Sequence, residues 1–390
     1  MATHRGTPED VRTANLSAVL GLLHRNGPQS RAALSRATGR NRSTMASLVA
    51  DLVELGLVEE HVPDPLGVVG RPSPVVSVRP DVVAIAVNPE IDALTIGLVG
   101  LDGGVRRVIR HSYDRIPTAA EVISITAAVV AGMSFELEAM HVVGIGVAVP
   151  GQVDTTDGSV RIAPHLGWRG EAFAAPLAEA TGLGVRVAND AGLGALAEHR
   201  FGAGKGRDHL IYLNGGASGI GGGVIVDGTL LGGASGFAGE LGHIRVSGAS
   251  QTDTAGFAGT LEALVTRAEL LEVLGLTQAG PDEFEQALLA DRSPAVQAIV
   301  TRQLNALGAA LAAAINLFNP NVIALGGFLA ALQAYDAELL RACVAVCALG
   351  PSLEAVEIVP AQLRSNLLMV GAAGMAFEEL LADPTVGRCR

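Results

Sequence analysis

The stretch Gly236-Phe-Ala-Gly-Glu-Leu-Gly-His243 places a carboxylate and an imidazole among glycines. Glu240 and His243 are three residues apart, so they lie on one face if the segment forms a helical turn. Each side chain can take part in two hydrogen bonds, which suits a small polyhydroxylated ligand. The alternative, on this stretch alone, is a solvated Glu–His pair at a capped helix end. The rest of the chain has to decide between these two interpretations.

The charge distribution predicts a basic N-terminal head on an acidic body. The chain has 390 residues, enough for two or three domains, and a formal net charge of -12. Residues 1–50 nevertheless carry seven arginines against only Glu9 and Asp10, namely Arg5, Arg12, Arg25, Arg31, Arg36, Arg40 and Arg42. This asymmetry favours a nucleic-acid-binding head, although the net charge of the whole chain argues against one.

The cysteines and the apolar runs predict a cytoplasmic protein with no membrane partner. Cys343, Cys347 and Cys389 provide neither a disulfide framework nor a zinc tetrad, which favours a reducing compartment. We expect Cys343 and Cys347 to be buried helix thiols; half a metal site is the alternative. The N-terminus is polar and resembles no signal peptide. The longest apolar runs, such as residues 309–315, are shorter than the roughly 18 residues of a membrane span.

Residues 1–80 predict a winged helix-turn-helix domain. Apolar spacing predicts a helix over about 12–25, while Ser30 and Asn41 are N-caps for helices over 31–38 and 41–55. The last two helices are joined at Gly39, as in a helix-turn-helix. Strands over 56–60 and 74–79 are expected to flank a β-wing, residues 63–72.

The candidate DNA-binding residues lie at the start of the third helix and on the wing. Side chains there can donate to phosphates or base edges in a major groove, and they are Arg40, Arg42, Ser43, Thr44 and Ser47. Arg71 lies near the expected wing tip, where it can enter a minor groove. The alternatives are a winged helix used for protein contacts and a plain three-helix scaffold.

The body alternates strands and helices, which predicts α/β lobes with a ligand cleft between them. Expected strands end in glycine-rich or polar motifs, at 82–87, 93–100, 105–111, 142–150, 185–188 and 322–325. Expected helices cover 118–140, 191–201, 293–317 and 364–382. We expect a first lobe over 81–190 and a second over 191–390, whose C-terminal helix can pack back on the first lobe.

Head and body motifs together resemble the ROK family (repressor, open reading frame, kinase), in particular its NagC/XylR-type regulators. The resemblance covers nearly the whole chain. It is carried by Arg12-x-x-Asn15, Gly70-Arg-Pro72, Gly144–Gly151, Asn189-Asp-Ala191, Gly219–Gly223, Ala238–His243 and Gly259-Thr-Leu-Glu262. It implies a two-lobed body of the sugar kinase/actin-like ATPase (ribonuclease H-like) fold.

The phosphate loop of the family's kinases is degenerate in this chain. Those kinases open the first lobe with Asp-x-Gly-Gly-Thr, and the matching positions here are Asn88-Pro-Glu-Ile-Asp92. The glycines are replaced by Glu90 and Ile91, whose side chains keep the backbone of the loop away from a phosphate group. The carboxylates of Glu90 and Asp92 would also repel the negative charge of the phosphates. We therefore expect no ATP-dependent phosphorylation. Asp190, a kinase's catalytic base, is expected here to accept a hydrogen bond from a sugar hydroxyl.

The resemblance also implies which residues contact a sugar, and it indicates that the family's zinc site is not kept in this chain. The implied sugar-binding residues are Asn189, Asp190, Glu240, His243 and Glu262. Trp168 either packs near the sugar or belongs to the core. Many family members hold zinc with a histidine and Cys-x-Cys-Gly-x-x-Gly-Cys, but the matching positions here are Asp253, Ala255 and Thr260. With His243 alone retained, no structural zinc is expected, and no other cofactor.

These features predict a sugar-responsive transcriptional repressor. A homodimer, or a dimer of dimers, would place two recognition helices on operator DNA, and a monosaccharide or sugar derivative would change their spacing. Whether sugar releases or promotes DNA binding stays open. One alternative is an ATP-dependent sugar kinase with an appended DNA-binding head. The other is a DNA-binding regulator whose sugar site is vestigial or answers to a phosphosugar or a protein partner.

Overall fold

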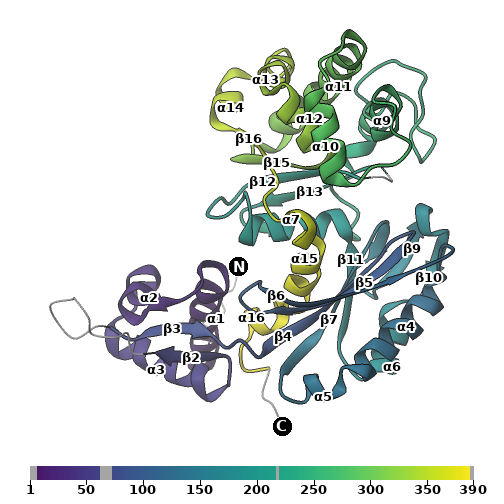
Figure 1. Ribbon diagram of the computed structural model, residues 1–390. Coiled ribbons are helices and arrows are strands. Elements are labelled where there is room, and N and C mark those ends of the chain that lie inside the picture. Colours follow the sequence, from purple (N-terminus) through teal and green to yellow (C-terminus); the bar gives the residue numbers. More distant parts are fainter. Residues whose placement is uncertain (1–6, 62–72, 217–218, 387–390) are drawn as a thin grey trace. The chain divides into compact units, whose positions relative to one another are not determined.

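The computed structural model describes residues 7–61, 73–216 and 219–386, and contacts divide the chain into two units (Figure 1). Unit 1 comprises Met1–Ala148, Ala172–Val187 and Ala372–Arg390, and unit 2 comprises Val149–Glu171 and Ala188–Gly371. The division into 1–80, 81–190 and 191–390 stays a prediction, because unit 1 holds both the head and most of the expected first lobe. Arg71 and the expected wing, residues 63–72, lie outside the described residues.

The helices of the head are capped as the sequence predicts. Ser30 Oγ accepts a hydrogen bond from the Ala33 amide (3.2 Å), and Asn41 Oδ1 accepts one from the Thr44 amide (2.9 Å). A three-stranded antiparallel sheet in the order β1-β3-β2 packs with them. The two-residue strand β1 is too short to show any alternation in the sequence. The elements are α1 (Pro8–Asn26), β1 (Gln29–Ser30), α2 (Arg31–Thr38), α3 (Arg42–Glu54), β2 (Val58–His61) and β3 (Val75–Val78).

The rest of unit 1 is built on a five-stranded sheet in the order β11-β7-β4-β5-β6. Strand β4 is buried along its whole length and pairs in parallel with β7 and antiparallel with β5. The strands are β4 (Val82–Pro89), β5 (Ala93–Gly100), β6 (Val105–Ser112), β7 (His141–Val149) and β11 (Val185–Asn189). The helices of this part include α4 (Ala119–Gly132), α5 (Ser134–Leu137) and α6 (Ala174–Thr181).

Two long helices expected from the sequence are broken in the structure. The helix expected over 118–140 ends as α4 at Gly132, a poor helix former, and the Met133 amide is shared between the carbonyls of Val129 and Val130. The helix expected over 364–382 is divided into η3 (Arg364–Asn366), α15 (Leu367–Ala376) and α16 (Glu378–Ala382). Helix α15 packs so closely on β7 that a Cβ at Gly146 would lie 1.8 Å from the Ala372 carbonyl oxygen.

Unit 2 holds a second five-stranded sheet in the order β14-β13-β12-β15-β16, in which β12 pairs in parallel with β15. Its strands are β12 (Leu210–Gly215), β13 (Ile220–Val226), β14 (Thr229–Leu230), β15 (Val322–Gly327) and β16 (Glu357–Pro360). Its helices are α7 (Asp190–Phe201), α8 (Leu261–Leu264), α9 (Arg267–Val273), α10 (Pro281–Ala290), α11 (Pro294–Phe318), α12 (Phe328–Tyr335), α13 (Ala337–Ala345) and α14 (Gly350–Ala355).

A small three-stranded sheet, β10-β9-β8, also belongs to unit 2. Its strands are β8 (Gln152–Asp154), β9 (Ser159–Ala163) and β10 (Trp168–Glu171), and η1 (Pro164–Leu166) lies between the last two. Trp168 begins β10 and is only 3% exposed. The structure therefore favours the core interpretation of Trp168 over a ligand contact.

Helix α11 is the one helix among the described residues that is long and apolar enough to span a membrane. One side of it is buried in the unit 2 core, through residues such as Val300, Leu304 and Leu311. The core helices of many proteins have the same length and composition, so α11 is only weak evidence for a membrane span. Cys343 on α13 is buried, as expected, whereas Cys347, which lies beyond the end of α13, is exposed and not buried as expected.

Glu198 on α7 is a fully buried carboxylate that joins distant parts of unit 2. Its Oε1 accepts hydrogen bonds from the amides of Gln362 (2.9 Å) and Leu363 (2.8 Å). Its Oε2 accepts one from the amide of Ala203 (2.8 Å). The loop after β16 is therefore fastened to α7 by one side chain.

We expect Glu198→Gln to lower the free energy of unfolding by about 1–3 kcal/mol. The amide group has one acceptor oxygen fewer, so at least one buried N–H would lose its partner. Urea denaturation measures the change. Glu272→Gln, at an exposed position of α9, is the matched control and should be nearly neutral. Equal stability of the two variants would contradict the role given to Glu198.

Candidate functional site

The start of α3 gathers the DNA-binding residues that the sequence predicts, apart from Arg71, which is not described. Arg40, Arg42 and Ser43 are exposed there, as is Ser47 one turn further on, and Thr44 is half-buried. The Ser43 hydroxyl donates to Asn41 Oδ1 (2.8 Å), the same oxygen that caps the helix. Ser43 thus supports the cap, and the side chains of Arg40 and Arg42 beside it are exposed.

The arginines of the head differ in whether their charge is already neutralised. Arg12 pairs with Asp51, and Arg31 pairs with Glu60. Within the described residues, no ion pair is formed by Arg36, Arg40 or Arg42. Apart from Arg25 near the end of α1, the unpaired arginines of the described head lie along α2 and at the start of α3, where a helix-turn-helix meets DNA phosphates.

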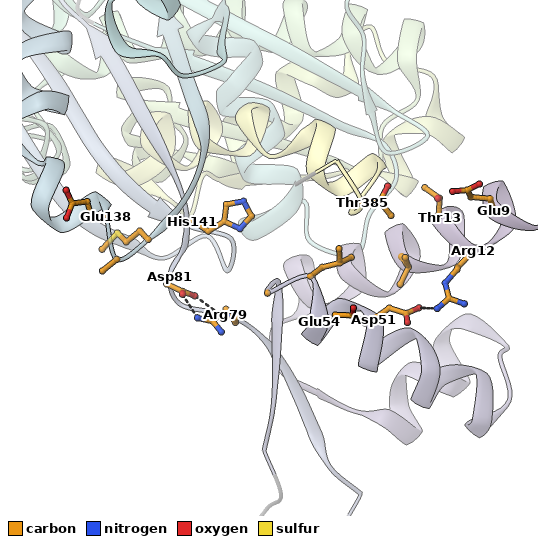
Figure 2. Close-up of a pocket in the computed structure, with 15 residues that line it drawn as sticks. Glu9, Arg12, Thr13, Asp51, Glu54, Arg79, Asp81, Glu138, His141 and Thr385 are labelled. Carbon is orange, nitrogen blue, oxygen red and sulfur yellow. Dashed lines mark hydrogen bonds and ion pairs between the residues drawn. The ribbon is translucent and has the colours of Figure 1, made fainter. Parts of the chain in front are cut away.

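A polar cavity of about 1020 Å³ lies elsewhere in unit 1, lined by α1, α3, the β3–β4 connection and the start of β7 (Figure 2). Arg12 pairs with Asp51 at one side, and Arg79 pairs with Asp81 at another. The lining also includes Glu9, Glu54 and Glu138. Because its guanidinium groups are paired and its remaining charges are mostly acidic, this cavity is suited neither to DNA nor to an anionic ligand.

Glycines fix the backbone around Glu240 and His243 in unit 2. Glu240 immediately precedes a single 3-10 turn, η2 (Leu241–His243), and His243 ends it, with the His243 amide donating to the Glu240 carbonyl (3.2 Å). Gly239 has a φ of +97°, which L side chains rarely adopt. A Cβ at Gly242 would lie 2.0 Å from the Ile220 carbonyl oxygen. The expected helical turn is therefore present, but it is shorter than an α-helical turn and is packed against β13.

Glu262, on α8, is a nearly buried carboxylate held by the protein itself. Its Oε2 accepts from the Ile220 amide (2.9 Å), and its Oε1 accepts from the Thr254 amide (3.1 Å) and hydroxyl (2.5 Å). One carboxylate oxygen of Glu262 also lies within 4.8 Å of a ring nitrogen of His243 and of a carboxylate oxygen of Asp253. The structure thus brings Glu262 to the predicted site but gives it a structural role there as well.

Asn189 and Asp190 begin α7, and both have partners within the protein. Asn189 Oδ1 accepts from the Gly192 amide as the N-cap (3.0 Å), and its Nδ2 donates to the Gly151 carbonyl (3.0 Å). Asp190 Oδ1 accepts from the Ala191 amide (2.7 Å). Gly151, whose carbonyl accepts from Asn189, is followed by Gln152, which contacts Glu240.

Two site residues escape the sequence-based prediction. Gln152 Nε2 donates to Glu240 Oε1 (3.5 Å), which links the segment after Gly151 to η2. Asp253 Oδ2 lies 2.9 Å from His243 Nδ1. The available signals were that Gln152 follows the glycine ending a buried strand, and that Asp253 occupies a metal-ligand position of the resembled family. The five predicted sugar-binding residues are thus connected through contacts within unit 2.

The His243–Asp253 pair shifts the pKa of both members. Burial alone would lower the pKa of His243, but its hydrogen bond to Asp253 and the charges of Glu262, Asp253 and Glu240 raise it above 6.5. Burial alone would raise the pKa of Asp253, but hydrogen bonds from His243, Phe257 and Thr260 hold it below 3.8. The pair therefore favours an imidazolium facing a carboxylate.

The fold and these features define a class: a winged-helix DNA-binding head joined to an α/β body of the sugar-kinase type. A MarR family model matches residues 17–66, and the ROK family model matches residues 92–379. The chain belongs to the ROK family.

Relatives of this chain include both repressors and kinases. It is 27% identical to the xylose repressor of Bacillus subtilis, over 95% of this chain and 97% of the repressor. It is 30% identical to the glucokinase of Thermotoga maritima, over 73% of this chain and 94% of the kinase. A solved ROK family transcriptional regulator, a homolog of the E. coli MLC protein, matches with a TM-score of 0.79 and 25% identity, over 96% and 97% of the two chains.

We expect the stability that His243 contributes to depend on pH from both sides. The lowered pKa of Asp253 gives stability that is present above 3.8 and lost as pH falls through its folded value. The raised pKa of His243 gives stability that is present below 6.5 and lost as pH rises through its folded value. The difference in Tm between wild type and His243→Gln should therefore be largest between these limits. Thermal melts at closely spaced pH values measure it, and a difference independent of pH would contradict the pairing.

Proposed function

We infer that this chain is a sugar-responsive, DNA-binding transcriptional repressor. The observation that carries the inference is the exposed start of α3, where Arg40 and Arg42 have no acidic partner among the described residues. The similarity to the xylose repressor, which extends over 95% of this chain, supports the same function. Operator DNA would be held by Arg40, Arg42, Ser43, Thr44 and Ser47, together with Arg71 of the wing that the sequence predicts.

We propose that the effector is an uncharged monosaccharide or sugar derivative bound by Asn189, Asp190, Glu240, His243 and Glu262. Three of these five residues are carboxylates, which accept hydrogen bonds from hydroxyls and repel an added phosphate group. The name of the Bacillus subtilis relative makes D-xylose the first sugar to test. A phosphosugar effector fits this set of residues less well.

We propose that the body binds sugar without phosphorylating it. The Asn88–Asp92 segment consists of the last two residues of β4 and the tight turn to β5, in which the Glu90 amide donates to the Ala93 carbonyl (2.8 Å). Asp92 is held by Arg110 (2.7 Å), and Asn88 is buried. A turn with these side chains lacks the bare backbone that cradles phosphates. Full-length similarity to repressors also favours a protein that is not an enzyme.

Assembly and signalling follow from the repressor function. We propose a cytoplasmic homodimer, or dimer of dimers, that presents two copies of α3 to successive major grooves. Helix α1 of the head contacts α16, and His24 on α1 hydrogen-bonds through Nδ1 to the Leu101 carbonyl. A sugar-dependent change in the body can reach the head through these contacts within unit 1, as a coupling between two binding sites.

We expect Arg42→Ala to weaken operator binding by about tenfold or more, because a phosphate or base contact is lost. If the contact is to phosphate, the slope of log affinity against log salt should also fall by about 1. Fluorescence anisotropy with a duplex selected from random sequences measures both. Arg302→Ala, which removes an ion-paired arginine of α11, is the control. Unchanged DNA affinity in Arg42→Ala would refute the choice of recognition helix.

Titration calorimetry with D-xylose and D-glucose should show binding, and the same samples with ATP should yield no sugar phosphate. Asp190→Asn keeps the side-chain volume but removes the charge, and should weaken binding by about tenfold. Steady turnover with ATP would instead favour the kinase alternative. No heat with any sugar would favour the vestigial site.

A further inference from the structure

The carboxylate of Asp253 is saturated with hydrogen bonds. Its side chain is fully enclosed, with 0% exposure. Oδ1 accepts from the amides of Ala255 (3.0 Å) and Phe257 (2.8 Å). Oδ2 accepts from the Thr260 hydroxyl (2.8 Å) and lies 2.9 Å from His243 Nδ1. Since a carboxylate offers about four lone-pair sites, all of its capacity is used by these four donors.

The four donors belong to separate parts of a loop with little regular structure. His243 ends η2, and the two amides come from the turn that follows Asp253 itself. Thr260 is the N-cap of α8, where its Oγ1 also accepts from the Ala263 amide (3.3 Å). One buried carboxylate therefore ties η2, the 253–257 turn and α8 together, as a central ion would.

The residues present do not fit the zinc ion that the family resemblance implies. Ala255 has no donor atom, and the Thr260 hydroxyl is already engaged with Asp253. The cluster of His243, Asp253 and Glu262 is compact enough for a cation. However, the carboxylates in it already accept four and three hydrogen bonds from the protein. A metal would have to break these bonds, and tetrahedral zinc would find only one imidazole and no thiolate.

We propose that Asp253 is the positioning residue of the sugar site and replaces the metal as the centre that orients His243. In the neutral imidazole one nitrogen donates and the other accepts. Because Nδ1 faces a carboxylate, it carries a proton in the neutral and in the protonated ring, and Nε2 is the atom left to face a sugar hydroxyl. Nε2 accepts from that hydroxyl when the ring is neutral and donates to it when the ring is protonated. Glu240, which precedes η2, supplies an acceptor, so the pair reads neighbouring hydroxyl groups.

The ring of His243 has a further constraint that agrees with this role. Phe257 lies edge-on to it, with ring centroids 6.2 Å apart and an interplanar angle of 80°. The same residue's amide donates to Asp253. The loop that carries the carboxylate thus also limits the rotation of the imidazole, and both contacts fix the direction of Nε2.

The proposal rests on sugar binding at this site, and the test separates the two. Histidine ¹⁵N NMR of the full-length protein, with His243→Gln to assign the signal, reports which nitrogen carries the proton, without any sugar. At a pH above the raised pKa of His243, where the ring is neutral, we expect the Nδ1–H tautomer in wild type. In Asp253→Asn, the amide NH₂ donates where the carboxylate accepted, so the Nε2–H tautomer should appear. Sugar affinity, measured by calorimetry, should fall at least tenfold.

The control is Asp282→Asn, at an exposed position of α10, which should change neither readout. An unchanged tautomer in Asp253→Asn would overturn the proposal. So would stoichiometric zinc in the purified wild type whose removal weakens sugar binding. If wild type binds no sugar, the proposed effector function fails, but the tautomer still decides the role of Asp253.

A second variant keeps the test decisive if Asp253→Asn does not fold. The triple change Asp253→Cys, Ala255→Cys and Thr260→Cys gives His243 three thiolate neighbours at the positions of the Cys-x-Cys-Gly-x-x-Gly-Cys pattern. With added Zn²⁺ it should fold and recover sugar affinity to within about tenfold of wild type. Failure to bind Zn²⁺, or binding without recovery, would show that Asp253 does not occupy an ion-equivalent position.

Discussion

A buried carboxylate is tolerated only when its oxygens are hydrogen-bonded, and unit 2 depends on several that are. Glu198 fastens the loop after β16 to α7, Glu262 joins the start of β13 to the 254 loop, and Asp253 holds the loop after η2. Each accepts at least two of its hydrogen bonds from backbone amides, so each fixes the path of a loop that is not paired in a β-sheet. The candidate sugar site is assembled from the last two of these anchors.

Local signals in the sequence predicted the elements and the fold class well. The caps at Ser30 and Asn41 were predictable because a short polar side chain just before a helical pattern of apolar residues favours the N-cap position. The α/β body followed from strands that end in glycine, and the turn at Glu240–His243 followed from its spacing. The breaks near Gly132 and Phe377 were missed because the apolar pattern continues across them.

Contacts between distant residues were not predictable in the same way. Glu198 meets Gln362, 164 residues away, and Gln152 meets Glu240, 88 residues away. No local pattern encodes such a pairing, since it depends on how strands are ordered in the sheets. In the sequence, Asp253 stood out only because it replaces a cysteine of the family pattern. Its role as a hydrogen-bond acceptor follows from the four donors that the structure places around it. The assignments of individual residues to sugar or DNA stay predictions.

The pairing of the head's arginines has a consequence for how the protein searches a genome. Non-specific DNA binding depends on unpaired Lys and Arg side chains, which displace the counterions condensed on the phosphates. Arg12 and Arg31 do not contribute, because each is already paired with a carboxylate. The remainder of the chain carries the acidic excess and is repelled by the duplex. Such a protein is held weakly by random sequence and approaches DNA in one orientation. More of its molecules therefore remain available for the few sites that it can read.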